Sequence, residues 1–167
     1  FLYIVNEMTG PDIGMQVVDL SPLPLSPPVH VSTYTNVEQS HNLWIDDNGL
    51  VFIEHHSGDN IHIANLIPMS GNPVYGGTFG NLAQNCHDMF TRNNFAYVSE
   101  GWSYQYGIYD INDLSNITQV ATITPINGGY AHNAWLNDSG THLVTTEETV
   151  NKTIKIWDIS DFNNITL

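Results

Sequence analysis

The sequence has very few cationic residues. Three lysines and arginines stand against 17 aspartates and glutamates, which gives a formal charge of −14. A protein that binds nucleic acid or an anionic membrane surface needs clustered lysines and arginines to neutralise phosphates, and this chain has too few of them. The acidic excess favours cationic partners or metal ions instead. The sequence therefore predicts a protein that does not bind nucleic acid.

Cysteine and long apolar stretches are scarce as well. Cys86 is the only cysteine, which excludes an intrachain disulfide and a multi-cysteine metal cluster. No apolar run approaches the ~20 residues of a transmembrane helix, so no transmembrane segment is predicted, and no window shows a sustained helical period. The 167 residues begin with neither a methionine nor a signal peptide, so we expect a piece of a longer or processed protein.

What the sequence does contain is an internal repeat. Three stretches open with a histidine followed by Asn or Asp, at His41, His87 and His132, so that the histidines are 46 and 45 residues apart. A column of glutamates that close short apolar runs keeps the same period: Glu7, Glu54, Glu100 and Glu147. A third column, expected to bond the backbone of the following turn, contains Asp19, Asn65, Asp110 and Asp158. Three columns with one period predict a repeated structural unit.

Each unit is built of strands. Short runs of β-branched and aromatic residues alternate with turn residues, and a unit of this length has the size of one propeller blade. A β-sandwich would explain the strands but not the period. We therefore predict an all-β fold, a segment of about three and a half four-stranded blades from a larger closed β-propeller. The predicted units are 1–36, 37–82, 83–128 and 129–167, and the remaining blades of the same polypeptide or other copies of the chain would complete the ring.

The hairpin register follows from placing each histidine directly opposite the glutamate of its unit. The pairs are His41 with Glu54, His87 with Glu100, and His132 with Glu147. The turn centres then fall at Asp47–Asn48, Asn93–Asn94 and Ser139–Gly140. These residues tolerate the positive φ angles of tight hairpin turns, although only the histidine and glutamate columns defined the pairing.

A metal site at one mouth of the propeller channel is the sharpest hypothesis. If the histidine strands are innermost, His41, His87 and His132 meet at the axis and would be the metal ligands. The glutamates that would orient them from behind are Glu7, Glu54, Glu100 and Glu147. Imidazole suits Fe, Zn or Cu, whereas Ca²⁺ would need Asn42, Asp88 and Asn133, which should face the other way. A purely structural role for the His–Glu pairs stays open, because duplication copies such pairs into every repeat.

Two groups of aromatic residues have different expected roles. Trp44, Phe90 and Trp135 occupy one position of the repeat and are expected to pack between blades. Trp102, Tyr104 and Tyr106 follow Glu100 near the predicted histidine ring, where exposed rings would bind a surface glycan or a protein ligand. Packing of this segment on the adjacent blade is the alternative. The sequence has neither a nucleophile elbow nor a phosphate-binding loop, so no catalytic residue is assigned.

The repeat motifs resemble those of LVIVD-repeat proteins, and more closely the "choice-of-anchor B" group of secreted and surface-anchored bacterial proteins. The stretches that carry the resemblance are the His-Asn/Asp openings with Tyr97–Gly101, Gly107–Asn112, Ala131–Trp135 and Ile156–Ser160. The resemblance implies a β-propeller that is extracellular or on the cell surface, and it supplies no reaction. The acidic, lysine-poor composition agrees with that location.

Two functions therefore remain open at the level of sequence. The first is an extracellular scaffold that binds a ligand or partner, with a His/Glu metal site at the channel mouth. The second is a metal-dependent oxidase or oxygenase that uses the histidine ring and an open coordination position. Elemental analysis of the purified protein separates the two.

Overall fold

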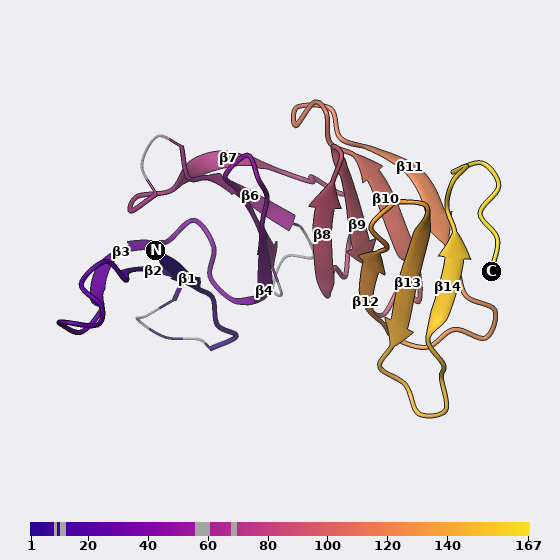
Figure 1. The fold of residues 1–167 in the computed structure, drawn as a ribbon, viewed down its shortest axis with the longest axis horizontal. Helices are drawn as coiled ribbons and strands as arrows, with labels where there is room; N and C mark the ends of the chain where they lie inside the picture. The colour runs from indigo at the N-terminus through magenta and orange to yellow at the C-terminus, as the bar shows by residue number, and fades with distance from the viewer. Residues whose placement is uncertain (9, 11–12, 56–60, 68–69) are drawn as a thin grey trace.

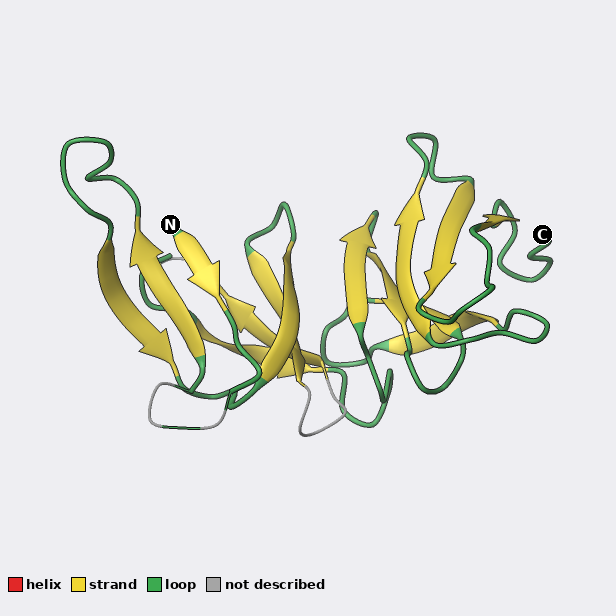
Figure 2. Cartoon of the chain, turned by 90° about the horizontal axis from the view of Figure 1, so that it is seen from below, coloured by secondary structure: helices red, strands yellow, loops and turns green. Residues whose placement is uncertain are grey.

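The chain folds into four antiparallel sheets that follow one another in sequence, as the computed structural model shows for residues 1–8, 10, 13–55, 61–67 and 70–167 (Figure 1). The first two sheets contain β1 (Leu2–Ile4), β2 (Met15–Asp19) and β3 (Val29–Tyr34), then β4 (Ser40–Ile45), β5 (Leu50–His55), β6 (Ile61–Asn65) and β7 (Val74–Thr78). The last two contain β8 (Asp88–Arg92), β9 (Phe95–Ser99), β10 (Tyr106–Asp110) and β11 (Thr118–Ile123), then β12 (Ala131–Leu136), β13 (His142–Glu147) and β14 (Lys155–Asp158). The described residues include no helix (Figure 2), so none in that part is long and apolar enough to cross a membrane.

Each sheet is a meander in which neighbouring strands are also consecutive in the chain. The first strands of the last three sheets form the inner side of the arrangement, because β4 contacts β8 and β8 contacts β12. Figure 1 shows the sheets side by side, from β1–β3 at the N-terminal end to β12–β14 at the C-terminal end. The predicted all-β propeller segment is therefore confirmed.

The hydrophobic core lies between the sheets, since a single meander cannot bury its own faces. Three clusters fill the three gaps between neighbouring sheets. The first gap contains Met15, Tyr34, Val51 and Ile53; the second Phe52, Ile63, Met89 and Val98; and the third Phe90, Ile108, Leu143 and Trp157. This packing fixes the inner strands against one another, which positions the histidines described below.

The β8–β9 hairpin has the predicted register. Phe90 pairs with Tyr97 and Arg92 with Phe95, which leaves Asn93 and Asn94 as the two turn residues, with φ angles of 52° and 60°. Two consecutive positive φ angles are typical of the type I′ turn that suits a two-residue hairpin.

The third column of the repeat also behaves as predicted. Its side-chain oxygens accept hydrogen bonds from main-chain N–H groups two residues further on. The pairs are Asp19 with Ser21, Asn65 with Ile67, Asp110 with Asn112, and Asp158 with Ser160.

Two bulges make the other predicted pairings wrong. In β4 the register shifts between Ser40, which pairs with His55, and Leu43, which pairs with Ile53. In β12 the predicted register holds from Asn133, which pairs with Thr146, to Leu136. It shifts between Ala131 and Asn133, so that Glu147 pairs with Ala131 instead of His132. His41 and His132 both lie inside these bulges, so neither stands directly opposite its glutamate, because a bulge sets an extra residue against the partner strand.

Candidate functional site

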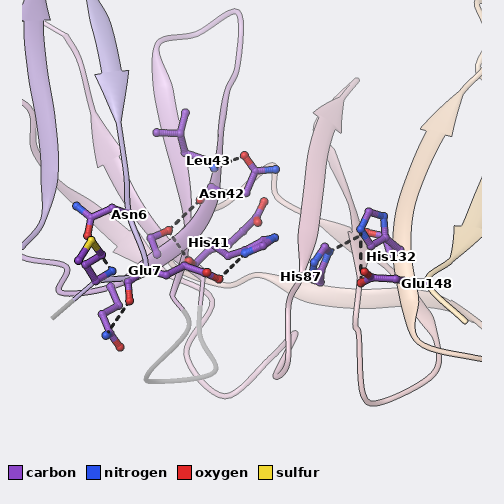
Figure 3. A network of polar contacts seen from close by, with 12 residues as sticks. Asn6, Glu7, His41, Asn42, Leu43, His87, His132 and Glu148 are labelled. Atoms are coloured by element: carbon purple, nitrogen blue, oxygen red, sulfur yellow. Dashed lines mark hydrogen bonds and ion pairs between the residues drawn. The ribbon is translucent and has the colours of Figure 1, made fainter.

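The three histidines of the repeat form a row across the inner strands. His41 belongs to β4, His87 immediately precedes β8, and His132 belongs to β12. The ring centroids of His41 and His87 are 4.4 Å apart, and those of His87 and His132 are 4.5 Å apart. Figure 3 shows the row with Glu7 at one end and Glu148 at the other. The structure thus brings together the three residues that the sequence singles out as metal ligands.

Hydrogen bonds orient two of these rings. The Nδ1 atom of His87 lies 3.0 Å from the main-chain oxygen of His132, and because a carbonyl only accepts, Nδ1 carries the proton. The Nδ1 atom of His41 lies 2.5 Å from Oε1 of Glu7. Burial lowers the pKa of His87, and the neighbouring His41 and His132 add to the effect of burial. A neutral His87 in this tautomer leaves the Nε2 lone pair to accept a hydrogen bond or bind a metal.

Three of the four column glutamates do not orient a histidine, so the prediction is wrong for Glu54, Glu100 and Glu147. Glu54 accepts the main-chain N–H of Met89 in the next sheet. Glu100 accepts the hydroxyl of Tyr109 at 2.6 Å, and Glu147 is bound by Lys155 and the N–H of Gly129. Their side chains therefore bind groups of the adjacent sheet or strand instead of the histidine rings.

The acid that does join the histidines at the far end of the row is Glu148. Its Oε2 lies 3.8 Å from Nε2 of His132, and one ligand atom each from His87, His132 and Glu148 fits within 4.8 Å. Sequence reasoning missed Glu148 because it lies one residue beyond the glutamate column. The corresponding positions, His55 and Gly101, carry no acid.

A second row lies beside the histidines. The side-chain amide of Asn42 donates to Oδ1 of Asp88 at 3.0 Å, and that of Asn133 donates to Oδ2 of the same carboxylate. Burial raises the pKa of Asp88. These hydrogen bonds connect three sheets and engage both carboxylate oxygens of Asp88, which a Ca²⁺ site would need.

The aromatic residues separate into a channel row and a pocket. The rings of Trp44, Phe90 and Trp135 contact one another, with the Phe90 and Trp135 centroids 4.7 Å apart, so the predicted packing between blades is confirmed. Trp102 and Tyr104 are 67% and 45% exposed and line a pocket that also includes Glu148. The pocket therefore opens beside the histidine row.

Tyr106 behaves differently from its two aromatic neighbours. It is buried, and its hydroxyl donates to the main-chain oxygen of Thr146. The prediction that Tyr106 presents an exposed ring is therefore wrong.

Comparison with solved structures identifies the fold. The chain is similar to a Bacteroides fragilis protein described as a candidate 6-phosphogluconolactonase, with a TM-score of 0.74, 10% identity, and coverage of 93% of this chain and 47% of that one. It is similar to a periplasmic gluconolactonase of Pseudomonas aeruginosa (TM-score 0.72, 13% identity, 93% and 49%). It is also similar to the WD40 β-propeller domain of Doa1 (TM-score 0.64, 14% identity, 98% and 49%). The chain spans about half the length of these proteins.

The family resemblance inferred from the repeat motifs is wrong. No family model matches the sequence, and no curated protein matches it. The similar solved structures named above are lactonase-like and WD40 propellers rather than LVIVD-repeat or choice-of-anchor B proteins. Short His-Asn and His-Asp motifs recur in this chain because every blade repeats the same strands and turns. The comparisons establish that residues 1–167 form part of a β-propeller.

Proposed function

We propose that this protein binds a ligand at the mouth of the propeller channel, and that a divalent transition-metal ion is part of the binding site. The observation that carries the proposal is the contact among three imidazoles from three successive sheets. Histidine rings at this spacing, without an acid between them, would repel one another once protonated. A metal ion bound to the nitrogen lone pairs of neutral imidazole rings would keep the rings unprotonated and so avoid this repulsion.

The donor set supports a zinc, iron or copper ion. His87, His132 and Glu148 supply two imidazoles and a carboxylate, which is a set that holds catalytic metals and leaves a coordination position open. The main-chain oxygen of His132 fixes the ring of His87, as the partners behind metal-binding histidines do. His41 lies next to His87 and would contact the ligand or complete the coordination.

Hydrolysis of an ester or lactone is a second candidate function. Two similar propellers carry lactonase names, and a metal with an open position can activate water or polarise a carbonyl group. The oxidase or oxygenase chemistry considered from the sequence requires iron or copper, so the identity of the bound metal separates it from a zinc hydrolase.

The proposal also includes how the ring is completed and where the protein is located. Further blades of the same polypeptide, or other copies of the chain, would complete the ring, because propellers close with ~4–8 blades. An extracellular or cell-surface location is supported by the acidic, lysine-poor composition, and one similar structure is described as periplasmic.

The first test is metal analysis of the full-length protein after metal-replete expression. We expect about one equivalent of transition metal per chain, and a loss of at least tenfold (about 1.4 kcal/mol) in metal affinity in the His87→Ala and His132→Ala variants. His30→Ala is the matched control, because His30 lies on β3 and contacts Thr33. Metal content below about a tenth of an equivalent, or unchanged content in His87→Ala, would overturn the proposed metal site.

The hydrolase candidate needs its own assay. If it holds, the metal-loaded protein cleaves D-glucono-δ-lactone, and His87→Ala or treatment with a chelator removes the activity while His30→Ala retains it. Lactone cleavage that survives chelation would exclude the metal-dependent mechanism.

A further inference from the structure

The pocket beside the histidine row has aromatic walls and a polar rim. It has a volume of about 610 Å³ and lies between the loop after β9, the loop before β12 and the loop after β13. Three of its lining residues are aromatic: Trp102, Tyr104 and Tyr130. The volume falls in the range of about 300–1,000 Å³ that is typical of small-molecule sites.

The aromatic rings form a cup rather than a stack. Trp102 meets Tyr104 at an interplanar angle of 90° and Tyr130 at 77°, so the neighbouring rings stand edge-on to the indole. Tyr130 in turn touches His87, with ring centroids 5.2 Å apart. Trp102 is 67% exposed, so a flat apolar ring faces solvent at the entrance to the histidine row. An exposed indole ring does not stabilise the fold, which favours a role in binding.

The rim supplies one group of each charge. Glu148 contributes a carboxylate, and Lys152 contributes an ammonium group that is held by the main-chain oxygen of Asn127. Lys152 is one of only three lysines and arginines in the chain, so a cationic group in this pocket is unusual for the protein. A side chain at Gly129 would collide with Thr149, so glycine allows these two lining residues to lie against each other.

The loop that presents the aromatic cup is strained. Tyr104 has a φ angle of +57°, a left-handed conformation that is costly for a bulky residue. Two main-chain hydrogen bonds close the turn. The N–H of Ser103 donates to the carbonyl oxygen of Glu100, and the N–H of Tyr104 donates to the carbonyl oxygen of Gly101. Strained residues of this kind gather at ligand-binding sites, where the position of the side chain matters more than backbone energy.

We infer that this pocket binds a sugar, specifically one hexopyranose ring packed on Trp102. A pyranose has an apolar face of C–H groups that suits an aromatic ring, and hydroxyl groups that can donate to Glu148 and accept from Lys152. A wholly apolar ligand would bury both charged groups without partners, which is costly. A phosphorylated or nucleic-acid ligand would meet the negative charge of Glu148 and of the whole chain. The inference rests on the proposed function in one respect, because Glu148 would serve both the ion and the sugar.

The test measures sugar binding by saturation-transfer NMR on the full-length protein with D-glucose, D-galactose, D-mannose and D-glucuronate, and in parallel on an array of immobilised glycans. We expect at least one sugar to bind with a Kd between about 0.1 and 10 mM. Trp102→Ala should weaken binding at least tenfold, an effect of about 1.4 kcal/mol. Binding of free sugars, or of array glycans only, supports the inference and distinguishes a free saccharide from a glycan terminus.

Two further variants separate the ring from the loop. Tyr104→Asn should also weaken binding while the loop keeps its shape, because asparagine adopts the left-handed conformation readily. Tyr75→Ala should bind as the wild type does, since Tyr75 is an exposed tyrosine on the outer strand β7 and does not line the pocket.

No binding in either arm at about 10 mM sugar, or equal affinity in Trp102→Ala, would overturn the inference. The same titrations are repeated after chelation of metal. Sugar binding that persists after chelation leaves the sugar site standing. The metal site is overturned separately, by metal content below about a tenth of an equivalent after metal-replete expression. Metal binding without sugar binding would overturn the sugar site alone.

Discussion

Glu54 is a carboxylic acid that the fold has almost entirely removed from water. Its residue is 1% exposed, its Oε1 accepts the N–H of Met89 at 3.1 Å, and its Oε2 has no hydrogen-bond partner among the described residues. Burial raises its pKa well above the ordinary value, and the negative charge of Asp88 raises it further. Burial likewise raises the pKa of the nearby Cys86 thiol. Ionisation of Glu54 is therefore disfavoured in the folded protein.

Replacement of Glu54 by glutamine should stabilise the protein at neutral and alkaline pH. Because the folded pKa exceeds the unfolded pKa, the folded state binds more protons, and wild-type stability falls as the pH rises above about 4.5 towards the folded pKa. Glutamine avoids that loss. The gain should grow by about 1.4 kcal/mol per pH unit across this window and vanish below it.

Urea unfolding of both proteins from pH 4 to pH 8 measures this difference in the free energy of unfolding. Glu38→Gln, at an exposed position, is the control. A difference that does not change with pH would mean that the fold does not disfavour the charged form of Glu54.

The β8–β9 hairpin shows how one element is determined locally. Its two-residue turn requires positive φ angles at both Asn93 and Asn94, and the two strands pair from Asp88–Arg92 to Phe95–Ser99 without a bulge. The β4–β5 hairpin differs, because its bulge is held by contacts that arise only in the folded sheet. One of these is the bond from the Ser40 hydroxyl to the main-chain oxygen of Glu54.

Substitution at Asn93 should separate backbone conformation from side-chain contacts. We expect Asn93→Ala to lower the free energy of unfolding by about 1 kcal/mol, because alanine disfavours a positive φ angle, and Asn93→Gly to be neutral or slightly stabilising. Thermal unfolding of the two variants measures the effect. Equal stability of the alanine and glycine variants would contradict a turn held by its φ angles.

The sequence alone could therefore predict the features that are repeated and local. The 46- and 45-residue spacing of the histidines, the turn at Asn93–Asn94 and the histidine row all follow from building one hairpin several times around an axis. The bulges at His41 and His132 could not be predicted, since they depend on packing against a neighbouring sheet. Glu148 could not be predicted either, because the other units carry no acid at the corresponding position.

At the scale of the whole molecule, both end sheets expose apolar side chains, and Ile156 on β14 is exposed where Ile63 and Ile108, its counterparts in the repeat, are fully buried. Val29 and Val31 on β3 are 52% and 47% exposed, and Ile154 and Ile156 at β14 are 67% and 56% exposed. Exposed apolar groups on flat sheets mark surfaces that another element covers. This agrees with a chain that spans about half the length of similar propellers.

We expect residues 1–167 expressed alone to self-associate at about 10 μM. On the proposed closure of the ring, the full-length protein should run as a compact species because further blades would cover its end faces. Light scattering after size-exclusion chromatography measures both, and the double variant Val31→Lys/Ile156→Lys should reduce association of the short chain. A monodisperse monomer of the unmodified short chain would show that these faces need no cover.

The Asp88 carboxylate accepts a hydrogen bond from the side-chain amide of each neighbouring inner strand. This pattern has a consequence for the number of blades in the proposed ring. An acid can serve two amide neighbours, but two adjacent acids would repel each other, so acids and amides should alternate around the axis. Perfect alternation requires an even number of blades. In a ring with an odd number of blades, two amides would be neighbours at one point.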